Sequence, residues 1–480
     1  MFRRTTDNLP KDPSYPADLT SLGYKLNSES QIVEIDKPAQ FFTFYATDND
    51  RANEVHKEAM HECVRNIVLD RLAEKGVKQI YVNGDGFVVS KPEGPHTTIL
   101  ATEPSVLKEK RDVVVVVNEH MQDLGIWSYR LLMREGGINA GSAVGLVEKL
   151  QAWGSGNGTQ GPVSAIKTAL QKLKLDGAAD DASHGDKLDA PGVIILNPGQ
   201  LIYSHALNTS MAQSTWMARP RATALDDHIR IDPIHNRVPG HETPEAHVYS
   251  TFEHIISRLT HDGARLYVVA LGEGGEALVN YLDTKLSADL GASIGEKLEA
   301  VAFMQPTHTP AQVKPQAVAN FLACRGRSWI LDEAPMGTLL NTPNILNGAQ
   351  TLESSTEALS VSEHSASNGH HHETSSSSSS SGQTQAIGRR TRSLLAKSDL
   401  SQSTVSLSQS QSTLSKSSIV EVSDEDPDPY AEIQVSCPTF SSGELEAAVP
   451  ELLWPAVMDD VLAWFKGYAE EGAAHDGRGS

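Results

Sequence analysis

The chain has 480 residues, which is enough for two or three average domains or for one α/β domain that carries a long insertion. Its formal net charge of −21 at pH 7 argues against a protein that binds the nucleic-acid backbone, where a basic face is expected. No apolar run approaches the roughly 20 residues that a membrane-spanning helix needs, so no membrane partner is predicted.

The first predicted elements are a long helix and two strands. Polar residues at 48–50 can cap a helix whose apolar side chains recur at helical spacing as far as Leu72, and Gly76 ends it. Residues 77–82 follow as a strand. The five consecutive valines within Asp112–Val117 predict a fully buried strand of a parallel sheet.

Strands and helices continue to alternate along the chain. Because parallel strands need crossover connections, this alternation predicts a mostly parallel sheet that helices cover on both faces. The predicted helices are 129–134, 143–153, 244–259 and 315–322, and the predicted strands are 192–196, 266–270, 299–304 and 328–331.

A Gly-rich corner follows the strand at 266–270 and leads into an amphipathic helix. This pattern has the shape of the nucleophile elbow of α/β-hydrolases, but the nucleophile position falls on Gly272, which has no side chain. A serine hydrolase also needs a histidine after its last strand, and the only later histidine here is His475 in a polar tail. We therefore expect no hydrolysis by this route. The neighbouring Glu273 is interpreted either as a base or as an acid near the positive end of the helix.

Groups of polar residues follow directly after two of the predicted strands. In open α/β folds, ligands bind at this edge of the sheet, beyond the carboxyl ends of the strands. The group after the valine strand predicts a pocket or partner site, or else a solvated loop whose acids cap the next helix. The group after strand 192–196 favours a tight turn that satisfies its own backbone. No cofactor or metal is predicted, and Trp127, Trp216 and Trp454 are interpreted as core or domain-surface aromatics. The candidate site comprises Asn118, Glu119, His120, Gln122, Asp123, Asn197, Gln200, Gly272 and Glu273.

The composition changes between residues 350 and 428, where Ser, Thr, Gln and acids dominate. Such a segment buries too little apolar surface to offset its ordering entropy, so we predict a disordered insertion. Folded character returns with a last strand at 432–436 and a helix at 449–468, which are too short to fold alone. We therefore assign 1–349 and 429–472 to one domain, with the insertion before its last strand. His370–His372 within the insertion is interpreted as incidental rather than as a metal site.

Several blocks together resemble the Argonaute-binding-protein-two (Arb-two) domain family in its fungal, stand-alone form. The resemblance covers residues 15–345 and 430–470, and it implies an α/β-hydrolase-like fold of three layers whose elbow lacks a serine. The blocks are His120–Trp127 with Tyr129 and Arg130, Asn197–Leu201, Asp232–Pro233, Asn236–Gly240, Gly272–Gly274, Tyr281–Asp283, Arg325–Arg327 and Ser441–Glu444.

The resemblance implies a protein-interaction subunit without catalytic activity. One family member belongs to a chaperone complex that holds Argonaute with duplex small RNA (siRNA) and supports heterochromatic histone methylation. The implied partners are Argonaute and a companion subunit. Alternatives are a chromatin module that binds histones or a deacetylase complex and can dimerise, or a hydrolase with displaced catalytic residues that uses His120 with Glu119 or Glu273. The family context and the three widely separated cysteines predict a location in the nucleus and cytoplasm.

Overall fold

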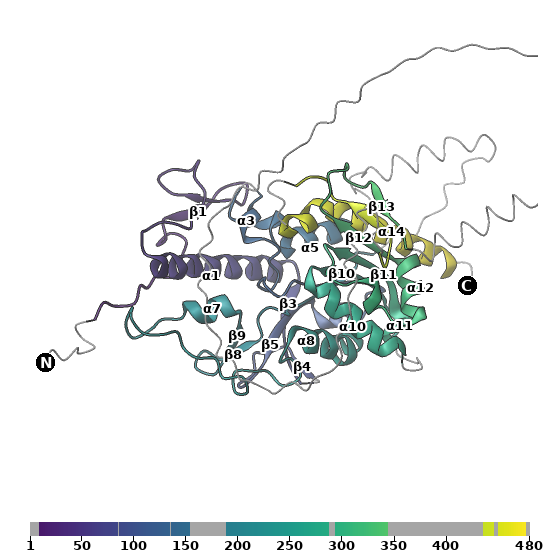
Figure 1. Ribbon diagram of the computed structural model, residues 1–480, viewed down its shortest axis with the longest axis horizontal. Helices are drawn as coiled ribbons and strands as arrows, with labels where there is room; N and C mark the ends of the chain where they lie inside the picture. The colour runs from purple at the N-terminus through teal and green to yellow at the C-terminus, as the bar shows by residue number, and fades with distance from the viewer. Residues whose placement is uncertain are drawn as a thin grey trace, which may run out of the picture. The chain divides into compact units, whose positions relative to one another are not determined.

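The structure, a computed structural model, describes residues 9–84, 86–134, 136–153, 189–287, 293–343, 435–445 and 450–476 (Figure 1). Its centre is a sheet of ten strands. From one edge to the other these are β13 (Leu339–Asn341), β14 (Thr439–Ser441), β12 (Gly326–Ile330), β11 (Leu298–Met304), β10 (Arg265–Leu271), β6 (Asp112–Val117), β7 (Gly192–Leu196), β5 (Thr97–Thr102), β3 (Val77–Asn83) and β4 (Gly86–Val88).

The strands from β14 to β7 run parallel to one another. The pairs outside this group are antiparallel, with β13 at one edge and β5, β3 and β4 at the other. The prediction of an α/β fold with a mostly parallel sheet is therefore confirmed.

The central position of β6 explains its unbroken run of valines. Every residue of β6 is buried, because β10 and β7 flank the strand and both of its faces are covered. Val114 and Val116 face one hydrophobic core, and Val113, Val115 and Val117 face the other. A strand with a solvated face would alternate apolar and polar residues instead.

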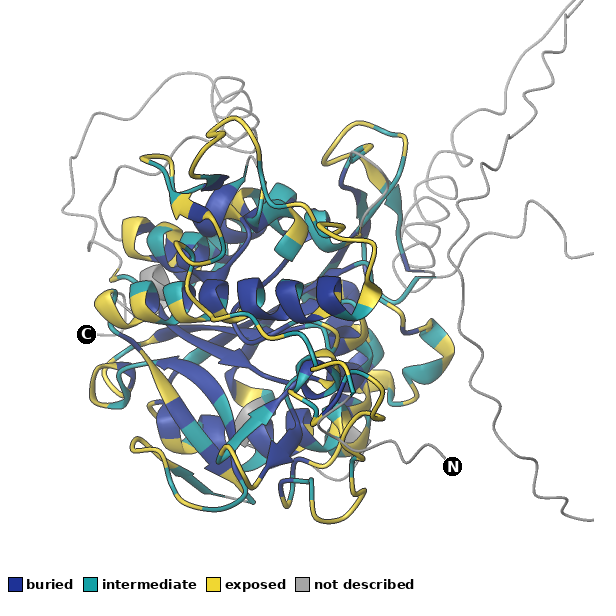
Figure 2. Ribbon diagram, turned by 90° about the vertical axis from the view of Figure 1, so that its left-hand side faces the viewer, coloured by how far each residue is buried: buried dark blue, intermediate teal, exposed yellow. Residues whose placement is uncertain are grey.

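Helices form a layer on each face of the sheet. One core joins the sheet to α1 (Asp50–Glu74), α5 (Ala143–Trp153) and α14 (Leu453–Asp476). The other joins it to α8 (Pro244–Ser250), α10 (Glu273–Ser287) and α12 (Gln316–Arg325). In Figure 2 the central strands are buried, whereas parts of the strands towards the edges and the outer faces of the helices are exposed. The fold thus has the three layers that were predicted.

Short elements complete the described part of the chain. The predicted helix at 244–259 is continuous but contains a π-helical turn, η2 (Thr251–Ile256), before its last part. Two small hairpins, β1–β2 and β8–β9, were not predicted. The remaining elements are β1 (Tyr24–Leu26), β2 (Ile32–Glu34), β8 (Ile202–Ser204), β9 (Thr209–Met211), α2 (Pro104–Leu107), α3 (Tyr129–Leu132), α4 (Gly137–Ala140), α7 (Gln213–Ala218), α9 (Ser257–Leu259), α11 (Ser293–Lys297), η3 (Pro310–Gln312) and η5 (Pro450–Leu452).

Of the predicted last strand, 432–436, residues 432–434 lie outside the described part of the chain. Val435 and Ser436 belong to no strand, and the described strand that joins the sheet between β12 and β13 is β14, three residues later. Besides its backbone pairing, β14 is held by a contact between hydroxyl groups: Ser328 Oγ lies 2.7 Å from Thr439 Oγ1 in the buried interior. The predicted insertion at 350–428, with its histidine run, lies outside the described residues. Among the residues that are described, no helix has the length and apolar character to cross a membrane.

Candidate functional site

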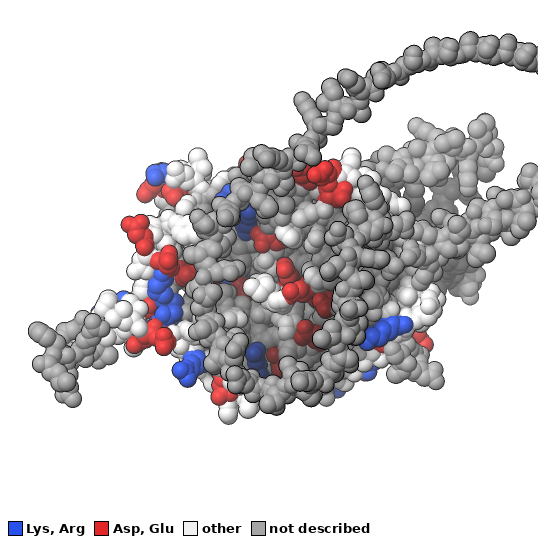
Figure 3. All heavy atoms as spheres, viewed as in Figure 1, with Lys and Arg blue, Asp and Glu red and all other residues white. Residues whose placement is uncertain are grey.

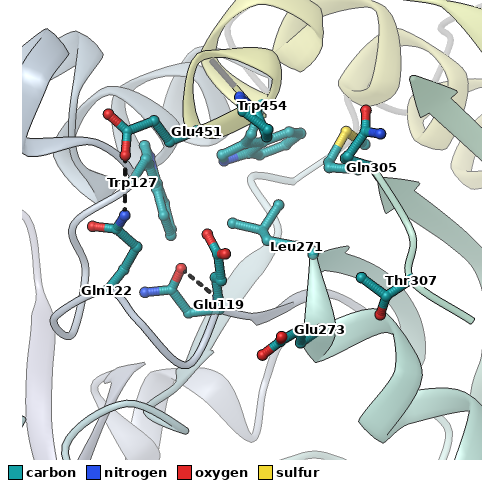
Figure 4. Close-up of a pocket in the computed structure, with 13 residues that line it drawn as sticks. Glu119, Gln122, Trp127, Leu271, Glu273, Gln305, Thr307, Glu451 and Trp454 are labelled. Carbon is teal, nitrogen blue, oxygen red and sulfur yellow. Dashed lines mark hydrogen bonds between the residues drawn. The ribbon is translucent and has the colours of Figure 1, made fainter. Parts of the chain in front are cut away.

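A cavity of about 200 Å³ opens at the carboxyl ends of the parallel strands. After β6 the chain places β7 on one side of that strand, and it later places β10, β11 and β12 on the other. The order of strands therefore reverses between β6 and β10, which is where ligands bind in open α/β sheets. The cavity is lined by Asn118, Glu119, Gln122, Trp127, Leu271, Gly272, Glu273, Met304, Gln305, Thr307, Pro450, Glu451 and Trp454 (Figure 4).

The turn from β10 into α10 has the strand–turn–helix form of the predicted elbow. Gly272 separates the two elements and adopts a φ of +50°, a conformation that disfavours residues with a side chain. Its N–H donates to the carbonyl oxygen of Met304 at the end of β11 (2.9 Å). At Gly274, a Cβ atom would lie 2.7 Å from the carbonyl oxygen of Asn118 and 2.8 Å from that of Val117. The first turn of α10 is thus packed directly on the end of β6.

Glu119 stands where a nucleophilic side chain would project. A Cβ atom built on Gly272 would meet Cγ, Cδ and Oε1 of Glu119 at 3.4 Å. Figure 4 shows the Glu119 carboxylate pointing into the cavity. Burial raises the pKa of Glu119; the charge of His120 opposes this, and the carboxylates of Glu273 and Glu451 add to it.

The other two carboxylates at the cavity already have partners. His120 Nδ1 contacts the carboxylate of Glu273, and both side chains are partly exposed at the rim. Glu451 accepts hydrogen bonds from Ser128 Oγ (2.9 Å) and Gln122 Nε2 (3.4 Å). The structure therefore brings His120 together with Glu119 and Glu273, as the candidate set requires.

Asp123 does not line this cavity, because it turns into the protein interior. Its carboxylate accepts hydrogen bonds from Arg65 (2.8 Å), Tyr129 (2.5 Å) and Gln200 (2.7 Å). Although burial opposes ionisation, the charge of Arg65 and these hydrogen bonds hold the pKa of Asp123 below its usual value. Asp123 therefore ties α1, the segment after β6 and the turn after β7 together.

Asn197 and Gln200 border a different cavity, of about 280 Å³. The N–H of Gln200 donates to Oδ1 of Asn197 (3.2 Å), so the turn satisfies its own backbone as the turn interpretation expects. The N–H of Asn197 donates to Nε2 of His247 (3.0 Å), whose Nδ1 lies 2.9 Å from Nδ1 of His241. Burial and the nearby His241 hold the pKa of His247 well below its usual value, so its ring stays neutral. These contacts hold the end of β7 in place.

Several residues of the cavity were not among the candidates. Gln305 and Thr307 follow β11, and the strand-end rule used for β6 and β7 would have found them. Glu451 and Trp454 come from η5 and the start of α14, beyond the composition change. No pattern in the sequence connects that helix with this edge of the sheet.

The lining residues restrict the chemistry of the cavity. They include neither serine nor cysteine nor histidine, and the only hydroxyl, that of Thr307, donates to Glu276 on α10 (3.2 Å). In the described part of the chain, no group of His, Cys, Asp and Glu side chains has the geometry to hold a metal ion. A catalytic triad cannot be assembled from these residues.

Comparison with known protein families gives a match over most of the chain. The model of the family described as the Arb2 domain matches residues 15–336, which include β6, β10 and the elbow between β10 and α10. No curated protein matches the chain.

Proposed function

Because the chain belongs to the Arb2 domain family, we propose that it is a non-catalytic protein-interaction subunit that binds Argonaute in small-RNA-directed heterochromatin silencing. A companion subunit of the same complex is the second partner. A role that involves both small RNA and chromatin predicts a location in the nucleus and the cytoplasm.

The observation that carries the non-catalytic part of this proposal is the pairing of Gly272 with Glu119. The nucleophile position has no side chain, and the space in front of it is taken by the carboxylate of Glu119, from the segment that follows the neighbouring strand β6. An enzyme of this fold keeps that space for the substrate and for the histidine that activates the nucleophile. In this proposal the turn at Gly272 has a structural role and no catalytic one.

The charge of the chain supports a protein partner with basic surfaces. Acidic residues outnumber basic ones, 61 to 40. Figure 3 shows Asp and Glu side chains at several places across one face, interspersed with Lys and Arg. A net charge of −21 favours contact with basic proteins and disfavours contact with the phosphate backbone, so contact with small RNA would run through Argonaute.

Affinity purification of the tagged protein from its native cells, with and without nuclease, tests the interaction role. Argonaute and a companion subunit that remain after nuclease treatment are the expected result. Histones or a deacetylase in their place would make the protein a chromatin module of the same family. Recovery of neither group would contradict the proposal.

A hydrolase with displaced catalytic residues is the competing function, and the contact between His120 and Glu273 is the observation that favours it. A histidine held by a carboxylate can act as a general base. We expect no turnover of simple esters or amides and no labelling by a fluorophosphonate probe. Turnover that His120→Ala abolishes would overturn the non-catalytic assignment.

A further inference from the structure

The carboxylate of Glu119 makes no hydrogen bond with any other side chain in the described part of the structure. Glu273 and Glu451, the other acids at the cavity, are matched by His120 and by Ser128 with Gln122. No lysine or arginine lines the cavity. The one positive charge that acts on Glu119 from its neighbours is that of His120, which is shared with Glu273. A half-buried carboxylate that faces no lysine or arginine is costly, because burial disfavours its charged form.

Two tryptophans beside Glu119 provide an independent observation. Trp127 and Trp454 line the cavity, each with only 2% of its surface exposed. Their rings meet edge to face, with centroids 6.4 Å apart and an interplanar angle of 83°. The indole Nε1 atoms of both residues are buried and have no hydrogen-bond partner. Buried Trp N–H groups usually find an acceptor, so this pair indicates an acceptor atom that a ligand would bring.

We propose that the cavity receives one positively charged side chain of a partner protein, with Glu119 as its counter-ion. Both indole N–H groups are closed to solvent, so they meet carbonyl oxygens of the incoming peptide only when its entry shifts the rings of Trp127 and Trp454. A cation also gains from contact with tryptophan rings, and a guanidinium gains most because it is planar and can stack. The volume of about 200 Å³ suits a single side chain rather than a folded segment.

This inference rests on the proposed interaction role, because it takes the cation from a protein rather than from a free metabolite. It adds the chemistry of the contact: an arginine or a lysine of the partner enters at the empty elbow. The rim pair of His120 with Glu273 then lies at the mouth of the cavity, beside the incoming chain.

The test is a titration of the full chain with the peptide acetyl-Gly-Arg-Gly-amide, followed by ligand-observed NMR. The matched peptide carries citrulline, which has the shape of arginine but no charge, and a lysine peptide tests the ammonium. We expect the arginine peptide to bind at least about tenfold more tightly than the citrulline peptide, as a lost charge-assisted hydrogen bond predicts. Equal binding of the two peptides, or no saturable binding of either, would overturn the inference.

Variants of the chain locate the binding. Glu119→Gln is expected to weaken binding of the arginine peptide roughly tenfold to hundredfold, and Glu109→Gln, at an exposed site on the same chain, should leave it unchanged. Trp454→Phe keeps a ring but removes an N–H donor, and a severalfold loss is expected. If the variants fold, as judged by circular dichroism, but bind like the wild type, the cation does not sit in this cavity.

Co-purification separates this inference from the proposed function. Loss of Argonaute from the Glu119→Gln pull-down, but not from the Glu109→Gln pull-down, would support both. If Glu119→Gln retains Argonaute at the wild-type yield, the interaction role stands and the cavity is not its route.

Discussion

The acids after β6 differ in role because they differ in surroundings. Asp123 faces inward and shares Arg65, Tyr129 and Gln200, so its charge is fully matched. Glu119 faces the cavity and has no such partner. Although the two residues are only four positions apart, the carboxylate of Asp123 stabilises the fold and that of Glu119 is available to a ligand. Burial and hydrogen bonding, rather than residue type, decide which of the two is a candidate for binding.

The buried position of Asp123 predicts a large loss of stability on neutralisation. Asp123→Asn removes the charge opposite Arg65 and leaves that guanidinium with Glu58 alone (2.6 Å). Breaking one side of a buried ion pair costs about 3–5 kcal/mol. Urea denaturation should show this loss. Asp70→Asn, at an exposed site on α1, serves as the control and should change the free energy of unfolding by less than about 0.5 kcal/mol.

Restoring a hydroxyl at the elbow should not restore catalysis. In Gly272→Ser a residue with a side chain would have to adopt the backbone φ of +50°, and its Cβ would contact Glu119. The free energy of unfolding should therefore fall by about 1–2 kcal/mol. No histidine lines the cavity to activate the new serine. A fluorophosphonate probe should therefore label Gly272→Ser no more than Gly272→Ala, which has the same backbone strain without a hydroxyl. Stoichiometric labelling of the serine variant alone would show that a base is present after all.

At the scale of elements, the cavity depends on how closely α10 approaches β6. The helix starts against the carbonyl groups of Val117 and Asn118, an approach that only a glycine at position 274 allows. Near the other end of the chain, α14 contains Gly467, around which nothing lies within 4 Å of an added Cβ. The two helical glycines thus have opposite consequences for packing.

A matched pair of substitutions measures this difference. Gly274→Ala should destabilise the protein by more than about 1 kcal/mol, because backbone atoms at 2.7 and 2.8 Å must move. Gly467→Ala should stabilise it by about 0.5–1 kcal/mol, since alanine favours the helix and finds space. Both changes are read from urea denaturation midpoints at constant slope. Equal effects of the two would mean that α10 can shift away from β6 without cost.

The elements that periodicity defines could be predicted, and those held by distant polar contacts could not. The valine run identified β6, and the Gly-rich corner identified the turn into α10. The position of β14 was not predicted because its buried residues are Thr439 and Ser441. Polar residues of this kind are typical of loops, and here their hydroxyls are satisfied by contacts with distant residues. Trp454 could be assigned to a core, but its place beside Glu119 depends on how α14 crosses the sheet. That crossing is set by tertiary packing, which no local pattern records.

At the scale of the whole molecule, buried neutral histidines occur in more than one layer. Burial lowers the pKa of His308 to about 4 and that of His61 to about 3, while His247 lies in the interior beside His241. Below pH 6.5 the unfolded chain binds protons at these positions that the folded chain does not. Each such histidine therefore contributes stability at neutral pH that is lost as the pH falls. Glu58 and Glu119, whose pKa values burial raises, act in the opposite direction.

Comparison of His308→Gln with the wild type isolates one of these groups. His308 contributes a loss of at most about 2 kcal/mol between pH 7.5 and pH 5, a range that crosses its unfolded pKa of about 6.5 and stays above its folded pKa of about 4. The variant should therefore lose less stability over that range than the wild type, as followed by urea denaturation at both pH values. His228→Gln, at an exposed site, should lose as much as the wild type. A His308→Gln curve parallel to that of the wild type would mean that the ring is protonated in the folded state.

The position of β14 between β12 and β13 means that the C-terminal segment is held by contacts and not by its covalent attachment. A backbone cut between residues 343 and 435 would leave two polypeptides that share one sheet and one hydrophobic core. Glu451 and Trp454 would then come from a separate polypeptide. The fraction of molecules with a complete cavity would depend on the concentration of the two polypeptides. A protease that cuts this stretch would thus make the cavity depend on protein concentration, because dilution would separate the two polypeptides.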